Sequence, residues 1–572
     1  MKHRRAGRMI VWALVATAAC SHDSTGPAAP TCSAALASRL TLAIGQYTSI
    51  DPASNDGCVT FPANASTVDS AEYLLVAQSA AATFGESSPF ALRAATLGAA
   101  PMAAAPSLAQ PAAAPSPATR FDGMLRRLGR EHAARAAAAA SRRLPGTALR
   151  PPVAAPPVLG SLRQFTVCAN DTSCGAAADF KTVGARVLAV GAHVAIYVDT
   201  LAPAGGLKSA DLDTLRQVFD TLLYPLDSAN FGAVSDLDAN GVVIALMTPV
   251  VNSLTTKAAC SASGGAYIAG FFFPADLDPN APAFQTNGGE IFYSIVADPN
   301  GTVSCAHTAA QVKTGTLGTF AHEFQHMINY AQHTLIQIQG GTVSEEGWLD
   351  EGLSQYAEEL TARRYLQAGD MATWDQLVGN DVFDAYQYLT ATGASPLLIE
   401  FDQGTQAERG ASWLFTRYLV DQFGAGLPGK LVQTTLAGSA NIAAQTGHSF
   451  DTTVTRWALA NWVSDLPGFV TPSELSYVSN SQDTTSWHFR TRTFASLYQQ
   501  DSSTFRHRYP LVPTASAGSA VSLSGTLRSG SGVYGRALQA PGAPGFTLFF
   551  SGSGAAALPA AVVPRLSVIR IR

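Results

Sequence analysis

The chain has 572 residues, which predicts two to four domains rather than one core. Hydrophobic residues make up 47% of it and charged residues only 13%, a composition that excludes a largely disordered protein. The net charge of −5 is small for this length, and no basic patch indicates nucleic acid as a partner.

The N-terminus predicts export. Four basic residues within Met1–Arg8 precede an apolar run, Met9 to Ala19, that is too short to span a bilayer and ends in small residues. We therefore expect residues 1–19 to be a signal peptide. The sequence VATAAC resembles the lipobox of bacterial lipoproteins, although Thr17 stands where leucine is usual.

That resemblance implies that Cys20 is acylated after cleavage and holds the protein at a membrane surface. The alternative is ordinary cleavage nearby, with Cys20 discarded. Either outcome places the protein outside the cytoplasm, in a bacterial cell envelope (as a lipoprotein, at the outer membrane) or secreted.

Cysteine usage agrees with export. Six cysteines follow Cys20, and an even number in an exported protein predicts disulfides. Six cysteines allow 15 pairings. Pairing between sequence neighbours is favoured because it keeps each bond inside one proposed domain. The six are Cys32, Cys58, Cys168, Cys174, Cys260 and Cys305.

The first third of the chain divides in two. Residues 20–97 alternate like strands and predict a small β domain. Residues 98–158 are rich in alanine and proline, which predicts a linker without a core. Within the linker, Phe121–Arg143 is expected to form a solvated helix. The alternative is a prosegment that is cut near Arg142 and Arg143.

Residues 159–470 are expected to form the main domain. Three apolar runs predict strands of its sheet, and the pattern becomes helical from Thr316 to about Gly468. Residues 471–572 alternate again and predict a β-sandwich-like domain. The predicted fold is therefore α+β, a sheet followed by a helical half, flanked by small all-β domains. The three strands are His193–Asp199, Gly241–Met247 and Glu290–Val296.

The motif that carries chemistry is HExxH, which starts at His322. At about 100° per residue, His322 and His326 lie on the side of a helix opposite to an apolar stripe that faces a core. Two imidazoles one turn apart can bind one Zn²⁺, with Glu323 beside them as the general base. The stripe is Leu317, Phe320, Phe324, Ile328 and Ala331.

A third ligand decides the class of site. The metzincin pattern fails because Asn329 and Gln332 stand where glycine and histidine are required. His333 lies seven residues beyond His326, roughly 10 Å along a helix, and is too far away to bind the same ion.

The segment WLDEGLSQYAEE, which contains Glu351 and Glu358, resembles the WLNEGxxxYxE segment of gluzincin peptidases. Together with HEFQHMIN it is similar to the hyicolysin-type family of secreted bacterial metallopeptidases. The resemblance implies a zincin-like catalytic domain, a zinc ligand at Glu351 and a supporting carboxylate at Glu358. Three further acids are expected to be solvated charges: Glu345, Glu346 and Glu359.

The sequence also departs from the gluzincin aminopeptidases. Their oxyanion-stabilising tyrosine is replaced by Ala407, and their amine-binding GxMEN strand is absent. GGEIFYSIV is expected to be the edge strand that pairs with a peptide. A zinc endopeptidase acting on peptides or proteins is therefore favoured. An aminopeptidase and a surface binding protein with a retired peptidase domain are the alternatives. The replacement candidates for the tyrosine are Tyr386, Tyr388 and Tyr418.

One weaker motif is DLDANG, Asp236–Gly241. It resembles the start of a calcium loop, but the twelfth position is Met247 where glutamate is needed. We expect a polar turn before a strand.

Overall fold

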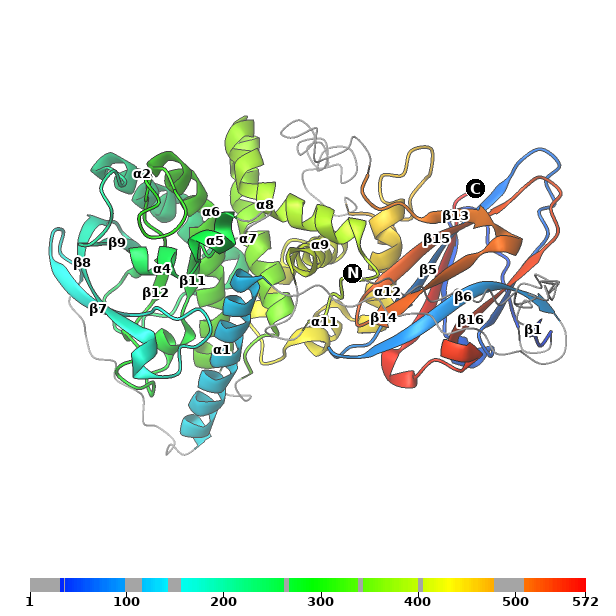
Figure 1. Cartoon of the computed structure of the whole chain (residues 1–572), viewed down its shortest axis with the longest axis horizontal. Helices are drawn as coiled ribbons and strands as arrows, with labels where there is room; N and C mark the ends of the chain where they lie inside the picture. The colour runs from blue at the N-terminus through cyan, green and yellow to red at the C-terminus, as the bar shows by residue number, and fades with distance from the viewer. Residues whose placement is uncertain are drawn as a thin grey trace, which may run out of the picture.

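The computed structural model describes residues 31–34, 37–97, 116–141, 156–261, 267–337, 343–399, 405–477 and 509–572. This part of the chain is a mixed α/β protein with three sheets. Figure 1 shows a sheet at one end, helices in the middle and a β sandwich at the other end. The signal peptide, Cys20 and the Arg142–Arg143 pair lie outside the described residues. Among the described helices, none is both long and apolar enough to cross a membrane.

The sheet of the main domain has the strand order β11-β12-β10-β9-β8-β7. Strands β9, β10 and β12 run parallel, and β11 is antiparallel to β12 at one edge. Every residue of β10 and β12 is buried, as is usual for parallel strands covered on both faces. The bounds are β7 Leu162–Cys168, β8 Phe180–Val190, β9 Val194–Asp199, β10 Val243–Met247, β11 Gly270–Phe272 and β12 Ile291–Ser294.

The three predicted strands of this sheet are present, but one prediction about their order is wrong. The strand expected at the edge, Glu290–Val296, contains β12, which lies between β11 and β10. The edge strand is β11, which was not predicted from the sequence because it is only three residues long. A peptide that adds to this sheet would therefore meet β11.

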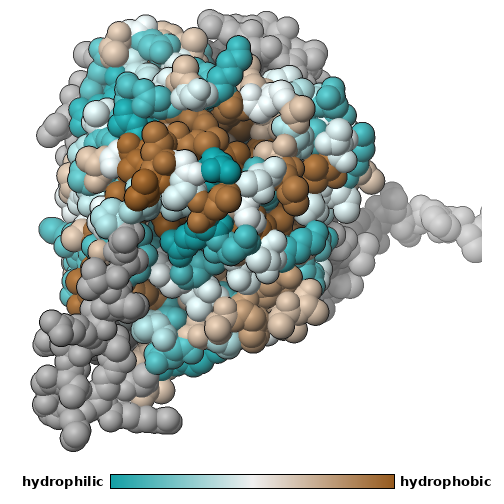
Figure 2. Space-filling model, turned by 90° about the vertical axis from the view of Figure 1, so that its left-hand side faces the viewer, coloured by the Kyte–Doolittle hydropathy of each residue, from teal (hydrophilic) through white to brown (hydrophobic). Residues whose placement is uncertain are grey.

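Strand β8 shows the alternation of a sheet with one solvated face. Val183, Ala185 and Val187 are buried, whereas Arg186 and Leu188 are exposed between and after them. Strands β7 and β8 lie at the end of the molecule farthest from the sandwich (Figure 1). Figure 2 faces that end, where apolar side chains gather in a band bordered by hydrophilic ones.

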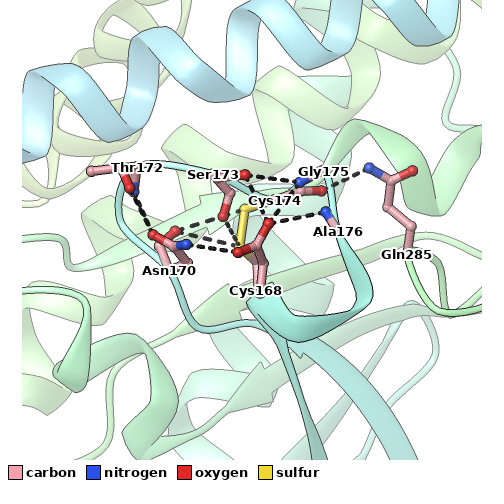
Figure 3. The surroundings of a disulfide bond; sticks show 9 residues. Cys168, Asn170, Thr172, Ser173, Cys174, Gly175, Ala176 and Gln285 are labelled. Atoms are coloured by element: carbon pink, nitrogen blue, oxygen red, sulfur yellow. Dashed lines mark hydrogen bonds between the residues drawn. A yellow bond between two sulfur atoms is a disulfide. The ribbon is translucent and has the colours of Figure 1, made fainter.

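The six cysteines pair between sequence neighbours, as predicted: Cys32 with Cys58, Cys168 with Cys174, and Cys260 with Cys305. The second bond closes the loop after β7, where Gln285 donates a hydrogen bond of 2.8 Å to the carbonyl oxygen of Cys174 (Figure 3). This hydrogen bond ties the loop after β7 to the segment that precedes β12.

Helix α6 (Ala309–Ala331) carries the HExxH motif. It begins at a capping box in which Thr308 and Gln311 satisfy each other's backbone N–H groups. Its predicted apolar stripe packs toward the sheet, with Phe320, Phe324 and Ile328 fully buried. The helix continues as a π-helical turn, η5 (Gln332–Ile336).

Helices α7 (Gly347–Gln367) and α8 (Met371–Thr390) pack beside α6, and α9 (Gln406–Phe423) packs against both of them. Two glycines allow the approach. A Cβ atom on Gly352 would lie 2.6 Å from the carbonyl oxygen of Ser412, and one on Gly410 would lie 2.2 Å from that of Asp384. Backbone therefore meets backbone at both crossings.

The two terminal β regions are not separate domains. Strands β5 (Ala71–Ser79) and β6 (Ser87–Leu97) from the N-terminal region pair with four strands from the C-terminal region. Both sheets of one sandwich therefore contain strands from both regions, which corrects the predicted flanking modules. The four are β14 (Ser522–Arg528), β15 (Gly532–Gln539), β16 (Phe546–Gly552) and β17 (Pro564–Arg570).

Strand β5 also joins the sandwich to the helices. Leu75 and Ala77 face the core between the two sheets, whereas Leu74 and Val76 belong to the core of the main domain. Strand β5 contacts α12 (Phe450–Val463), and Tyr534 of β15 donates a hydrogen bond of 2.8 Å to the Ala458 carbonyl oxygen of that helix. The sandwich is thus packed onto the main domain rather than tethered to it.

The helix expected within the linker is present as α1 (Pro117–Ser141), but it is not solvated. Phe121, Met124, Leu125 and Leu128 repeat at helical spacing and are buried in the core of the main domain. Gly129 of the helix lies against Pro274 and Tyr330. Helix α1 is buried because of this apolar face, which the alanine- and arginine-rich composition of the segment conceals.

Candidate metal centre

Three side chains from two helices converge on one position. His322 and His326 come from α6, and Glu351 comes from the N-terminal part of α7. The Nε2 atoms of the two histidines are 3.0 Å apart, and the Glu351 carboxylate lies 3.4 Å from His326 Nε2 and 3.6 Å from His322 Nε2. The three form a group whose ligand atoms could hold one metal ion.

Two further carboxylates fix the protons of the histidines. Glu358 lies 2.8 Å from Nδ1 of His322, and Asp350 lies 3.1 Å from Nδ1 of His326. A carboxylate accepts, so each Nδ1 carries the hydrogen and each neutral ring turns its Nε2 lone pair to the shared position. Two lone pairs 3.0 Å apart repel each other unless a cation lies between them, so the donor set fits a metal ion.

The charges around Glu351 keep it ionised. Burial alone would raise the pKa of Glu351, but Arg409 and His326 outweigh it and hold the pKa well below its usual value. Arg409 lies 3.2 Å from one carboxylate oxygen and Arg126 lies 3.2 Å from the other. An ionised Glu351 is the form that binds a cation.

Glu323 lies beside the histidines and is held by the edge strand. Its Oε2 accepts a hydrogen bond of 2.8 Å from the backbone N–H of Phe272 in β11. Burial raises the pKa of Glu323, against the lowering effect of His322 and His326. A carboxylate with a raised pKa is suited to taking up and releasing a proton near neutral pH.

The metal position opens into a cavity of about 350 Å³. His322, Glu323 and His326 form its floor, and β11 lines one side. Four helices supply the remaining charged lining: Asp122 and Arg126 from α1, Glu358 from α7, Asp381 and Asp384 from α8, and Arg409 from α9.

Several predictions about nearby residues are wrong. Glu359 is fully buried between Arg363 and Arg417, and Glu345 is buried where it accepts hydrogen bonds from Gly438 and Asn441. Glu346 is partly buried and accepts a hydrogen bond from the Trp348 indole N–H. These acids were expected in solvent, because a sequence shows neither the cations nor the backbone N–H groups that receive them.

Two of the three tyrosine candidates lie away from the cavity. Tyr388 is buried and stacks on Trp457, and Tyr418 donates a hydrogen bond of 2.8 Å to the Glu474 carbonyl oxygen. Tyr386 is not among the cavity-lining residues. His333 is buried on η5, 3.9 Å from Glu345, and does not approach the metal position.

Sequence reasoning missed Asp350, Arg126 and Arg409. Asp350 could have been found, since it precedes Glu351 on the same helix and a ligand histidine needs a partner for its second nitrogen. Arg126 and Arg409 carry no local signal, because they reach the site from two other helices, α1 and α9, that are distant from α7 along the chain.

A second group of carboxylates, Asp236, Asp238 and Glu290, gathers beside β10. Glu290 accepts hydrogen bonds from Ser235 and from the backbone of Leu237, and Asp238 accepts from Asn240. Asp236–Gly241 is thus a polar turn before a strand, as the sequence predicted, and hydrogen bonds to Asp238 and Glu290 hold it.

Comparison with known proteins places the chain near metalloproteases. No protein-family model matches it. A neutral metalloprotease of Staphylococcus hyicus, ShpI, is 31% identical over 156 residues, which are 27% of this chain and 30% of the relative. The chain therefore matches less than a third of that relative's length, and the similarity supports a metal-dependent peptidase.

Proposed function

We propose that the protein is a zinc-dependent endopeptidase of the gluzincin type, with a zincin-like catalytic domain. The observation that carries the proposal is the convergence of two Nε2 lone pairs and the Glu351 carboxylate on one position, with Glu323 beside it. Two imidazoles and one carboxylate from three protein residues leave a coordination position open, as catalytic zinc sites do.

A bound zinc ion would lower the pKa of a water molecule toward 7 and polarise the scissile carbonyl. Glu323 takes the proton from the attacking water and delivers it to the leaving amine. The Phe272 N–H holds one oxygen of Glu323, which orients the other oxygen for this transfer. Glu358 and Asp350 keep the two histidines in the tautomer that binds metal.

Three observations support the finer assignments. The absence of the GxMEN strand favours internal cleavage of a peptide or protein substrate over removal of N-terminal residues. The three disulfides are compatible with a location outside the cytoplasm. The lipobox-like sequence before Cys20 supports attachment to a membrane surface.

The test is cleavage of an N-terminally blocked, internally quenched peptide library, with and without a zinc chelator. We expect cleavage that the chelator abolishes and zinc restores. The variant Glu323→Gln should bind zinc as tightly as the wild type but lose hydrolysis by several orders of magnitude, because it cannot accept a proton. Retained turnover in this variant would contradict the assignment. Cleavage of free but not blocked peptides would indicate an aminopeptidase.

A further inference from the structure

Helix α1 lies across the cleft that contains the metal position. Its Phe121 ring packs edge-to-face on Phe271 of the edge strand β11, with 5.2 Å between the centroids. On the other side, its charged residues reach α7 and α9. Figure 1 shows α1 beside β11, α6 and α7, where the sheet meets the helices. A peptide that pairs with the open edge of β11 would have to enter the same space.

Two charged side chains of α1 face the groups that surround the metal position. Arg126 forms ion pairs with Asp350 at 2.6 Å and with Glu351 at 3.2 Å. One turn earlier, Asp122 pairs with Arg409 at 3.1 Å. Asp122 also lies 3.0 Å from Arg126, so the helix contributes an anion and a cation to one buried network.

The position of Arg409 is that of a substrate-binding group. It lines the cavity together with His322 and Glu323, and it lies 3.2 Å from Glu351. Its guanidinium lines the cavity, and a carboxylate of the same chain, Asp122, pairs with one of its nitrogens. Without Asp122, Arg409 would keep its ion pair with Glu351, and the donors that Asp122 now occupies would be open to whatever occupies the cleft.

We propose that Arg409 binds an acidic side chain of the substrate, and that in the intact chain Asp122 of α1 occupies Arg409 in its place. Helix α1 is thus a built-in competitor of the substrate, and Arg409 determines specificity. This inference rests on the proposed function, because it takes the ligand of the cleft to be a substrate. The competition between Asp122 and an acidic ligand for Arg409 concerns binding alone.

The connections of α1 suit such a role. Residues 98–115 and 142–155, on either side of it, are rich in alanine and proline, a composition that builds no core of its own. Strand β6, which precedes the first of them, is held by β14 and β16. Cuts in both connections would therefore leave the sandwich paired, and α1 would be held only by its packing and ion pairs.

The experiment measures peptide binding without turnover. The full chain carrying Glu323→Gln is loaded with zinc and titrated with two fluorescent blocked peptides that differ only in one residue, glutamate or glutamine. Adding Asp122→Asn should tighten binding of the glutamate peptide about tenfold, because a charge-assisted contact of α1 is lost. Glu131→Gln, the same change at an exposed position of α1, should leave the affinity unchanged.

A second variant identifies the cation. In the Asp122→Asn background, with zinc in excess so that the site stays loaded despite the lost Arg409–Glu351 ion pair, Arg409→Met should abolish the preference for glutamate over glutamine. A synthetic peptide of residues 116–141 should displace the fluorescent peptide from the Asp122→Asn chain, which tests the competition even if that variant weakens the attachment of α1.

Unchanged or weaker binding in Asp122→Asn would overturn the proposal and indicate that α1 is a permanent wall of the site. Discrimination that survives Arg409→Met would also overturn it. Failure of the proposed function would give a different result. Peptide affinity would then change in the variants as expected, while the chain with intact Glu323 would cleave nothing.

Discussion

Glu358 and Asp350 each hold one histidine by the ring nitrogen that faces away from the metal position. Such partners fix the tautomer and the orientation of the ring before the metal arrives, and they make the ligand more basic. Asp350 also binds Arg126 and receives a hydrogen bond from Asn329, so it is itself held in place. The single carboxylate therefore links α1, α6 and α7.

Removing either carboxylate should weaken zinc binding without removing a ligand. We expect Asp350→Asn and Glu358→Ala each to lower zinc affinity about 10- to 100-fold, because each ring nitrogen loses its carboxylate partner. Competition with a chromogenic chelator measures the affinity. Asp213→Asn, which changes an exposed acid of α2 (Ser209–Val218), is the control. Equal affinities in the wild type and all three variants would contradict this account of the two carboxylates.

Glu345 should make stability depend on pH. Burial raises its pKa to about 8, although hydrogen bonds from Gly438 and Glu346 oppose the shift. Between the usual value near 4.5 and about pH 8, the folded chain holds a proton that the unfolded chain releases. The contribution of Glu345 to the free energy of unfolding therefore falls as pH rises through this window.

Glu345→Gln removes that titration. The unfolding temperature of the variant, relative to the wild type, should rise progressively from about pH 5 to about pH 8 and then level off. Thermal denaturation across this range at constant ionic strength measures the difference. A difference that stays constant with pH would show that Glu345 is ionised throughout, and the hydrogen bonds from the backbone would then outweigh burial.

Glycine is needed where the site helices cross. Glu351 lies next to Gly352, and a Cβ atom there would be 2.3 Å from Thr416 Oγ1 and 2.6 Å from the Ser412 carbonyl oxygen of α9. The close crossing sets the distance between α7 and α9, and therefore the distance between Glu351 and Arg409. The glycine of the WLDEG segment is thus a packing requirement of the metal centre.

Gly352→Ala should destabilise the fold by about 1–3 kcal/mol, because overpacking outweighs the better helix propensity of alanine. Gly379→Ala is the matched control. Gly379 lies inside α8, and a Cβ atom added to it would meet no other atom within 4 Å, so alanine there should stabilise by about 0.5–1 kcal/mol. Urea denaturation of both variants measures the change in the free energy of unfolding, which should fall for Gly352→Ala and rise for Gly379→Ala. Stabilisation by Gly352→Ala would show that α7 and α9 can separate at no cost.

The elements of the site differ in how far the sequence predicted them. The HExxH spacing predicted α6, because two ligands one turn apart require a helix, and the resemblance of the WLDEG segment to gluzincin peptidases implied the ligand on α7. The burial of α1 did not follow. Its apolar face, with Phe121, Leu125 and Leu128, is readable at helical spacing, but the surface that receives it comes from distant parts of the chain, such as β11 and Pro274.

At the scale of the whole molecule, the sequence predicted β structure at both ends but not that the ends meet. Strand β5, near the N-terminus, pairs with β15 on one side and β17 on the other, close to the C-terminus. Alternating patterns predict which residues face a core, but they carry no information on which distant strand completes it. The main domain, its sheet as well as its helices, is therefore an insertion between two halves of one sandwich.

This topology predicts how the chain responds to truncation. A chain ending at residue 508 loses β13 (Thr514–Ala517) to β17, which leaves β5 and β6 without the four neighbouring strands that pair with them. Leu75, Ala77 and Leu92 would then be exposed, along with unpaired backbone groups of a long edge strand. We expect this chain to aggregate or to bind a dye for exposed apolar surface, and residues 509–572 supplied as a separate chain to restore solubility.

Separable terminal domains would give the opposite result. The chain ending at 508 would stay monomeric, and its unfolding temperature and zinc affinity would match those of the full chain. Gel filtration, dye binding and zinc titration of the truncated chain, alone and with the supplied strands, decide between the two. Because α12 packs against β5 and β17, we expect the damage to reach the helical half, so zinc affinity should fall as well.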